Sequence, residues 1–368
     1  MVLYLLLAAA AFLITLVLTP LARRIGVALN AVDHPGGRHI NKSTTPRSGG
    51  LAIFAAFIVV FLYSAPDGPA KIGIALGAAV IFILGFLDDL YGLSAPVKLA
   101  VQIAVALIVI AFGVRIRCIS HPLGGFSEIG AAWGVPLTVL WMVAMMNMIN
   151  LIDGLDGLAA GVTAIAGGTL FFIAIMKGQV LAAIMCSIVV GSTLAFLVFN
   201  FHPARVFMGD GGALLLGYIL GVISVQGALK AATAVTLVIP VLALGVPFFD
   251  TLLAIVRRAR AGQPIMAADR GHLHHKMMDL GLTQRQTVLI LYLISAALGG
   301  AALISTVSEV PISALFLVAF LGTGVYGGYK IGVIERESVP GQGHGQVQGR
   351  GAGRGPGRPG SGSGRTLR

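Results

Sequence analysis

Residues Asn147–Gly161 read Asn-Met-Ile-Asn-Leu-Ile-Asp-Gly-Leu-Asp-Gly-Leu-Ala-Ala-Gly, and this polar stretch separates two long apolar runs. Its amides, Asn147 and Asn150, are three residues apart, a spacing that puts them on one face at the end of a helix. A glycine follows each of the carboxylates Asp153 and Asp156, and glycine weakens a helix. We therefore expect a helix that ends in a tight polar loop at a membrane surface. For this stretch alone, a plain polar turn between two spans is the simpler alternative.

The composition indicates an all-α, polytopic integral membrane protein. Of the 368 residues, 57% are hydrophobic and only 11% are charged, whereas soluble domains carry about 25% charged residues. Cys118 and Cys186 lie in different segments and favour neither a disulfide framework nor a thiolate metal site. The net charge is +11, and the positions of its Lys and Arg residues fit a membrane topology. We therefore expect the protein to lie in a lipid bilayer and to have no nucleic acid partner.

Apolar runs long enough to cross a bilayer, which takes about 20 residues and as few as about 17, recur along the whole chain. We predict about eleven transmembrane helices. They cover residues 2–20, 49–65, 71–87, 98–114, 132–149, 158–176, 180–199, 212–228, 232–256, 286–305 and 311–330. The first run lacks a basic segment before it and is followed by Pro20 and Arg23-Arg24. This pattern favours a first span with an outside N-terminus over a cleaved signal peptide.

The positions of the cations test this orientation. With the N-terminus outside, the outer loops hold few of the 25 Lys and Arg residues, namely Lys71, Arg115, Arg117, Lys177 and Lys230. An excess of cations inside obeys the positive-inside rule. We therefore predict a multi-pass protein of the cell inner (plasma) membrane whose C-terminus is cytoplasmic. Residues 1–334 are expected to form the transmembrane domain, and the Gly/Arg-rich tail, residues 335–368, to be disordered because it has almost no apolar residues to bury.

This topology gathers the unusual polar clusters on the cytoplasmic face. Besides the central stretch they are Asp33–Arg38 and Thr45–Gly50 in loop one, Asp88-Asp89 with Lys98, Asn200–Gly212, Asp250 with Arg257-Arg258, and Asp269–Lys276. Carboxylate and amide oxygens without thiolates suit a hard cation such as Mg²⁺, which proteins hold with one or two carboxylates plus substrate phosphates. Arg, Lys and His suit phosphate oxygens. The combination favours metal-assisted phosphoryl transfer at a membrane surface.

Each cluster also has a plainer interpretation. Asp210 before a helix fits an N-cap, and Asp88-Asp89 fit the solvated end of a helix. His272 to His275 fit a zinc site only in some backbone shapes, and Arg257-Arg258 fit a positive-inside anchor. All of these clusters share one predicted face. A separate structural role for every cluster is therefore a weaker explanation than a single functional site.

At these residues the chain resembles the polyprenyl-phosphate N-acetylhexosamine-1-phosphate transferase family, glycosyltransferase family 4, of which phospho-MurNAc-pentapeptide translocase is a sister. The resemblance covers about residues 20–330. The family's Asp-Asp pair, Asn-x-x-Asn-x-x-Asp-Gly-x-Asp-Gly, Phe-Met-Gly-Asp and His-x-His-His motifs are intact, and they lie at Asp88-Asp89, Asn147–Gly157, Phe207–Asp210 and His272–His275. The form Asp-Arg-x-His-Leu-His-His resembles the GlcNAc-1-phosphate branch. Loop one departs from the family, with Arg38-His39-Ile40-Asn41 where Arg-Lys-x-His is usual, which leaves room for a different sugar.

The resemblance implies transfer of GlcNAc-1-phosphate, or a related N-acetylhexosamine-1-phosphate, from a UDP-N-acetylhexosamine to undecaprenyl phosphate, with release of UMP. It implies Mg²⁺ as the cofactor, with Mn²⁺ as a substitute, and leaves a homodimer open. The implied roles are metal ligation by Asn150 and Asp210, catalysis by Asp88, Asp89, Asp153 and Asp156, and substrate binding by Lys98, Asn147, Arg270, His272, His274 and His275.

Two other classes of protein were weighed against the transferase. A secondary transporter of an anionic metabolite places its site near the bilayer midplane between inverted repeats, whereas the sequence shows no such repeat and its polar groups lie at one predicted surface. A binding or scaffold protein leaves the carboxylate cluster unexplained.

Overall fold

The computed structural model describes residues 1–33, 44–120, 126–228, 238–260 and 273–307, together with Gly262 and Gly322. The described helices belong to one compact unit, Met1–Ile334. In chain order they are α1 (Val2–Ala28), α2 (Gly50–Ser64), α3 (Pro69–Tyr91), α4 (Ala95–Ala111), α5 (Ala131–Ile152), α6 (Leu158–Met176), α7 (Val180–Asn200), α8 (Gly209–Ala228), α9 (Val238–Ala243), α10 (Gly245–Arg260), α11 (Leu273–Asp279) and α12 (Gln284–Val307). Two short antiparallel pairs, β1 (Val32–Asp33) with β2 (Thr45–Pro46) and β3 (Cys118–Ser120) with β4 (Phe126–Glu128), complete the described elements.

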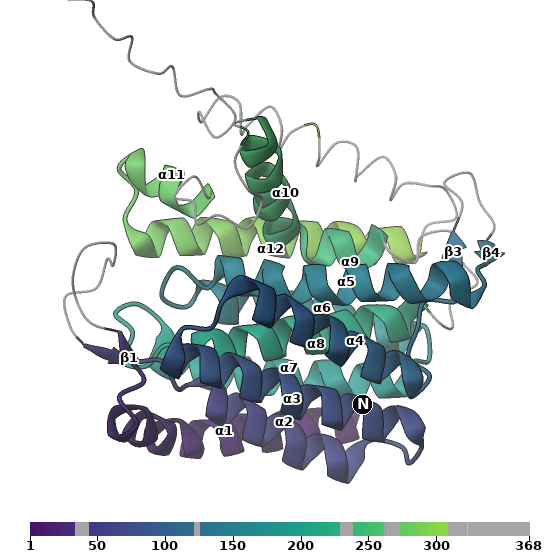
Figure 1. Ribbon diagram of the computed structural model, residues 1–368, viewed down its shortest axis with the longest axis horizontal. Coiled ribbons are helices and arrows are strands. Elements are labelled where there is room, and N and C mark those ends of the chain that lie inside the picture. The colour runs from purple at the N-terminus through teal and green to yellow at the C-terminus, as the bar shows by residue number, and fades with distance from the viewer. Residues whose placement is uncertain are drawn as a thin grey trace, which may run out of the picture. The chain divides into compact units, whose positions relative to one another are not determined.

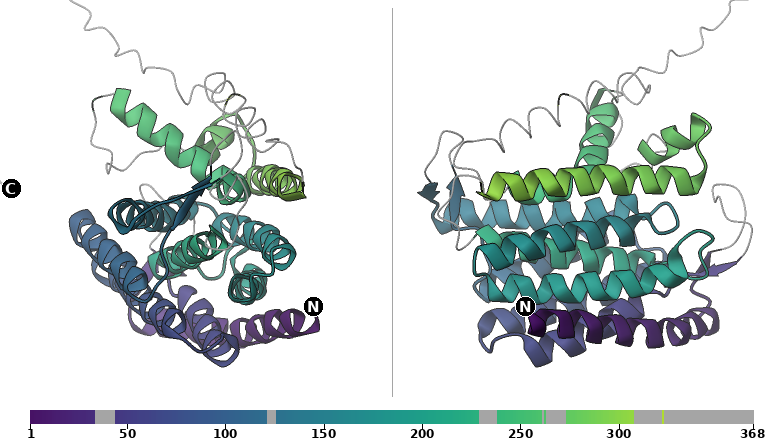
Figure 2. Two further views of the ribbon diagram at one scale, coloured as in Figure 1. Left: turned by 90° about the vertical axis from the view of Figure 1, so that its right-hand side faces the viewer. Right: turned by 180° about the vertical axis from the view of Figure 1, so that it is seen from behind.

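The all-α, multi-pass prediction is confirmed in its coarse form. Within the described residues, seven helices are long and apolar enough to cross a membrane, namely α1, α3, α5, α6, α7, α8 and α12. The helices α2 and α4 are apolar but shorter. Figure 1 and Figure 2 show these helices side by side as a bundle. The predicted span 311–330, the tail 335–368 and loop residues 34–43 lie outside the described residues.

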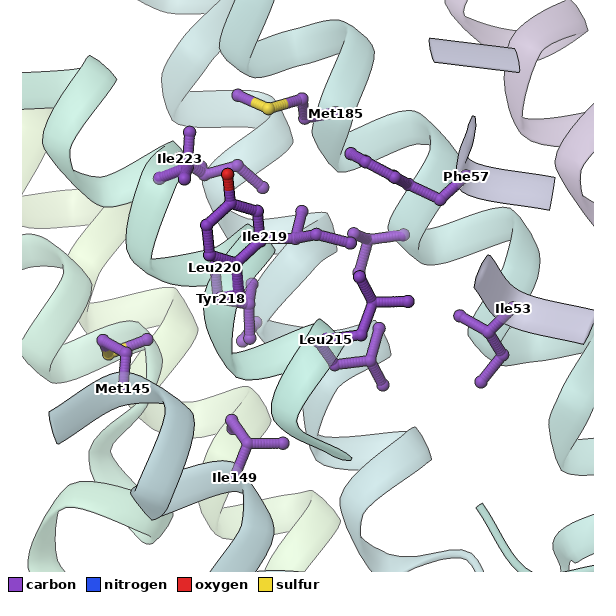
Figure 3. Close-up of a cluster of buried hydrophobic side chains, with 14 of the residues drawn as sticks. Ile53, Phe57, Met145, Ile149, Met185, Leu215, Tyr218, Ile219, Leu220 and Ile223 are labelled. Carbon is purple, nitrogen blue, oxygen red and sulfur yellow. The ribbon is translucent and has the colours of Figure 1, made fainter. Parts of the chain in front are cut away.

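The helix α8 occupies the centre of the bundle. It packs against α3, α5, α2 and α7, and Figure 3 shows Leu215, Tyr218 and Ile219 of α8 among apolar side chains of α2, α5 and α7. The Tyr218 hydroxyl donates a hydrogen bond to the Ile74 carbonyl of α3 at 3.0 Å. Helices in a membrane associate through close packing and such interhelical bonds rather than through the hydrophobic effect. The start of α8 is therefore held firmly at one end of the bundle.

One predicted span is wrong. Residues 232–256 were expected to form a single helix, but the described part contains α9 and α10, separated at Leu244. Gly245 and Pro247 open α10, and proline is favoured in the first turn of a helix but disrupts a helix interior. In Figure 1 and Figure 2, α10 runs across the direction of the other helices.

Candidate active site

Four segments that are far apart in the sequence meet at one end of the bundle. They are the last turn of α3, the first turn of α4, the loop between α5 and α6, and the first turn of α8. In Figure 1 and Figure 2, β1 and α11 lie at this end, and the β3–β4 hairpin lies at the opposite end. The polar clusters around Asp88, Asn150 and Asp210, which were predicted to share one face, therefore share one end of the described structure.

Lys98 joins two of the predicted carboxylates. Its Nζ lies 2.6 Å from Asp88 Oδ2 and 3.5 Å from Asp210 Oδ2. The other Asp88 oxygen, Oδ1, accepts the Leu93 N–H at 2.7 Å, and the carboxyl groups of Asp88 and Asp210 are close enough to interact with each other. Two carboxyl groups in contact disfavour double ionisation unless a cation compensates them. The pair is thus a place where positive charge is stabilised.

Asp89 points to a different set of partners. Its Oδ1 accepts the Asp210 N–H at 3.0 Å, and its Oδ2 accepts the Gly211 N–H at 3.1 Å. The first backbone N–H groups of a helix have no partner within the helix, and a carboxylate satisfies them. Asp89 therefore caps α8 from α3, whereas Asp210 lies inside the first turn of α8. The N-cap interpretation of Asp210 does not describe this structure.

Two glycines allow this close approach. Gly209 has φ +74°, a left-handed conformation that favours glycine. A side chain at Gly209 would meet the Arg47 carbonyl and the Asp89 carboxylate, and a side chain at Gly85 of α3 would meet the Asp210 carbonyl. The glycine of Phe-Met-Gly-Asp is thus required by the backbone that places Asp210.

The two amides of the central stretch differ in their contacts. Both lie on α5, as predicted. The Asn150 amide is close enough to the Asp210 carboxyl group to affect its ionisation, so the two predicted metal ligands are adjacent. Asn147 uses its Nδ2 to donate to Gln102 Oε1 of α4 at 2.7 Å and to the Val143 carbonyl at 2.8 Å. Asn147 therefore links α4 to α5 within the described contacts.

The loop between α5 and α6 brings Asp153 toward the same cluster. The pKa of Asp153 is raised well above its ordinary value because the surrounding protein desolvates its carboxyl group and because Asp210 and Asp89 are close, while Arg47 partly opposes the rise. Ionisation of Asp153 is therefore disfavoured unless a cation compensates the charge.

Asp156 is buried and is occupied by the loop that follows α7. Its Oδ2 lies 2.8 Å from His202 Nδ1 and accepts the Ala204 N–H at 3.0 Å. The guanidinium of Arg285 at the start of α12 donates to the His202 carbonyl at 3.0 and 3.2 Å. These contacts give Asp156, which was predicted to be catalytic, a part in holding the loops around the site.

The described part of the histidine motif lies on α11. His274 is buried, and its Nε2 lies against Gly154 of the α5–α6 loop. The rings of His274 and His275 are 4.3 Å apart. Asp250 of α10 accepts the Leu273 N–H at 2.8 Å, which fixes the start of α11. Arg270 and His272 lie outside the described residues.

The donors at this end fit Mg²⁺ shared with a substrate. The Asp210 carboxylate and the Asn150 amide are adjacent oxygen donors, and Mg²⁺ is typically held by one or two carboxylates plus substrate phosphates. Among the described residues, no three His, Cys, Asp or Glu side chains are grouped closely enough to hold a metal ion. A site built this way therefore needs phosphate oxygens to complete it.

Several residues of this region were not among the predicted site residues. Asn200 accepts the Gly157 N–H at 3.0 Å and donates to the Val206 carbonyl at 2.9 Å, and His202, Gln102, Asp33 and Arg47 make the contacts given above and below. Asn200, His202, Asp33 and Arg47 fall in polar clusters that the sequence singled out, but they pair with residues 14, 43 and 46 positions away in the chain. No local pattern identifies such partners.

Fold and site together define a multi-pass membrane protein with a carboxylate and lysine cluster suited to phosphate chemistry. A family model described as "Glycosyl transferase family 4" matches residues 71–228. A protein of Bacillus subtilis (strain 168) named "Probable undecaprenyl-phosphate N-acetylglucosaminyl 1-phosphate transferase" is 41% identical over 312 residues, which cover 84% of this chain and 86% of that protein. The "Decaprenyl-phosphate N-acetylglucosaminephosphotransferase" of Mycobacterium tuberculosis (strain ATCC 25618 / H37Rv) is 35% identical over 315 residues, 77% of this chain and 78% of that one. The "Undecaprenyl-phosphate alpha-N-acetylglucosaminyl 1-phosphate transferase" of Yersinia pestis is 28% identical over 320 residues, 84% and 87% of the two chains. The chain belongs to glycosyl transferase family 4, and the resemblance drawn from its motifs is confirmed.

Proposed function

We propose that this protein transfers GlcNAc-1-phosphate from UDP-GlcNAc to undecaprenyl phosphate and releases UMP, the first membrane step of cell-envelope glycan synthesis. The names of its relatives support the sugar phosphate and the polyprenyl phosphate. The observation that carries the proposal is the Asp88–Lys98–Asp210 cluster with Asn150 beside it, at one end of a membrane bundle. Such a cluster suits two phosphate-bearing substrates, one of which is a lipid.

The reaction exchanges one phosphorus–oxygen bond for another. An oxygen of the lipid phosphate attacks the phosphorus that carries the sugar, a new P–O bond forms, and the bond to the bridging oxygen breaks. UMP leaves with the electrons of that bond. A phosphate monoester has a second pKa of about 6 and is largely dianionic at pH 7, so the nucleophile needs no dedicated general base.

The residues around the cluster position and neutralise these phosphates. Lys98 lies between Asp88 and Asp210 and supplies a fixed positive charge at the cluster. Asp210 and Asn150 are the residues that would hold Mg²⁺, with Asp88 next to them. When bound, Mg²⁺ supplies charge neutralisation on the diphosphate and the leaving group. Asp89 fixes the backbone of Asp210, and His274 lies beside the α5–α6 loop, where it would contact the donor.

The orientation in the membrane is part of the proposal. An outside N-terminus puts the cluster at the cytoplasmic face of the inner membrane, and the distribution of Lys and Arg supports this. The cluster end holds Arg47, Lys98 and Arg285, and the opposite end holds Arg115 and Arg117 beside β3.

One assay tests the proposed reaction. Membranes that contain the protein are incubated with labelled UDP-GlcNAc, UDP-GalNAc or UDP-glucose and with undecaprenyl or decaprenyl phosphate, and the lipid product is analysed. We expect a lipid diphosphate that carries GlcNAc, with UMP as the nucleotide product. Release of UDP, which marks transfer of the sugar without its phosphate, would contradict the proposal.

A further inference from the structure

Arg47 has no role in the account above, although it stands next to the cluster. It follows β2, and its N–H donates to the Ala31 carbonyl at 2.8 Å. Its Nη2 lies 2.7 Å from Asp33 Oδ1 on the paired strand β1. The hairpin thus presents a guanidinium that is held by a carboxylate.

The backbone around Arg47 is fixed against the start of α8. The Phe207 N–H donates to the Pro46 carbonyl at 2.8 Å, and the Gly49 N–H donates to the Phe207 carbonyl at 2.9 Å. The Gly50 N–H donates to the Met208 carbonyl at 2.9 Å. These bonds join loop one to the segment that ends in Asp210, so the position of Arg47 relative to the carboxylates is set by the fold.

Arg47 and Lys98 act on different carboxylates of the cluster. Lys98 contacts Asp88 and Asp210, whereas the charge of Arg47 acts on Asp89 and Asp153. The side chain of Arg47 is 36% exposed, against 12% for Asp33. The bond to Asp33 uses one of the five N–H donors of the guanidinium, and more than a third of the side chain is accessible to a ligand.

We propose that Arg47 binds substrate phosphate oxygens and that Asp33 is the positioning residue that orients its guanidinium. The planar fork of Arg matches phosphate oxygens with two parallel hydrogen bonds. The phosphate belongs either to the lipid acceptor or to the diphosphate of the donor, since both carry the same chemistry. This inference rests on the proposed function and adds a residue to its site.

The alternative is that Arg47 and Asp33 form a structural ion pair only. Both Arg47→Gln and Asp33→Asn break that pair, and Asp33 makes a further contact. A purely structural role therefore predicts a loss from Asp33→Asn at least as large as the loss from Arg47→Gln. Phosphate binding predicts the larger loss from Arg47→Gln, because Asp33→Asn leaves the guanidinium in place. Arg47→Lys keeps the charge without the fork, and Arg24→Gln removes an exposed cation from the end of α1 as a matched control.

The experiment measures steady-state kinetics of detergent-solubilised full-length protein with UDP-GlcNAc and undecaprenyl phosphate, together with the melting temperature. We expect Arg47→Gln to lower kcat/KM at least about thirtyfold, as expected for loss of one charged phosphate contact, and to raise KM for one substrate. Asp33→Asn should lose less than about tenfold, and Arg24→Gln less than about twofold, because exposed charges contribute little. A higher KM for the lipid assigns Arg47 to the acceptor, and a higher KM for UDP-GlcNAc assigns it to the donor.

A loss from Asp33→Asn at least as large as that from Arg47→Gln, with KM unchanged for both substrates, would overturn the inference. If the parent protein transfers no sugar phosphate, the proposed function is wrong, but this result does not decide whether Arg47 binds phosphate. A binding measurement then decides the role of Arg47, with UDP and farnesyl phosphate as probes. We expect either probe to raise the melting temperature of the parent and not that of Arg47→Gln, and an identical rise in both would exclude phosphate binding by Arg47.

Discussion

The Asp89 carboxylate accepts the backbone N–H of Asp210 at 3.0 Å, so one aspartate of α3 fixes the start of the helix that carries another. The side chain of Asp210 is left to Lys98, Asp88 and Asn150. Capping of α8 and the side-chain contacts within the carboxylate cluster are thus divided between two residues that lie 121 positions apart in the chain.

This division predicts opposite effects on stability. Asp89→Ala removes the acceptor for two N–H groups and should lower the free energy of unfolding by about 0.5–2 kcal/mol, the usual range for a lost cap. Asp89→Asn should lose less, since Asn caps about as well as Asp. Asp210→Ala should leave the melting temperature unchanged or raise it, because it removes a carboxylate from a crowded cluster. Thermal unfolding of the three solubilised variants checks this, and a larger loss for Asp210→Ala than for Asp89→Ala would argue against the division.

Lys98 provides a second test. Lys98→Met removes the cation between Asp88 and Asp210 and should lower turnover by a factor on the order of 10²–10³, as for other lost electrostatic elements of a transition state. Lys71→Met is the matched control, because Lys71 pairs at 2.8 Å with the exposed Asp67 and such surface pairs contribute little. Turnover per folded protein is the measurement. If both variants kept parental activity, Lys98 would have no part in the reaction.

Metal dependence follows from the adjacent oxygen donors Asp210 and Asn150. EDTA should abolish transfer, and Mg²⁺ or Mn²⁺ added in excess should restore it. Asp210→Asn should need more Mg²⁺ for half-maximal activity, since a neutral amide is a weaker ligand for a hard cation than a carboxylate. UMP release at the full rate in the presence of chelator would show that the reaction needs no divalent metal ion.

Orientation can be tested by labelling single cysteines with an impermeant thiol reagent in intact cells. Gly130 near the β3–β4 hairpin and Ser94 before α4 are exposed, and a side chain at Gly130 meets open space. In a background with Cys118→Ser and Cys186→Ala, Gly130→Cys should react from outside, and Ser94→Cys should react only after permeabilisation. The reverse pattern would place the active site outside.

The sequence identified the parts of this site that depend on local pattern. Apolar runs bounded by polar clusters predicted most of the described helices. The spacing of Asn147 and Asn150, with the glycines Gly154 and Gly157 after them, predicted a helix that ends in a loop. The break at Leu244 was missed although Gly245 and Pro247 signal a new helix. The apolar run around them reads as one continuous span, and that length of apolar sequence outweighed the two helix-start signals in the prediction.

Local sequence patterns could not predict which residues the site residues contact. Asp156 meets His202 at a separation of 46 positions, and Asn147 meets Gln102 at a separation of 45 positions. Such pairs are set by which helices pack together, and neither spacing nor hydrophobic period encodes them. For the same reason the sequence grouped Asp88 with Asp89, whereas the structure gives them different partners.

The central claim is that Asp210 serves the reaction, and Asp210→Asn tests it most directly. The change preserves the size of the side chain and leaves the cap of α8 to Asp89, but it removes a negative ligand charge. The measurement is turnover per folded enzyme at saturating Mg²⁺, with the melting temperature of the solubilised protein as the control. We predict a near-parental melting temperature and transfer slower by at least about a hundredfold. A variant with a parental melting temperature and activity within about threefold of the parent, far short of that electrostatic loss, would contradict the claim.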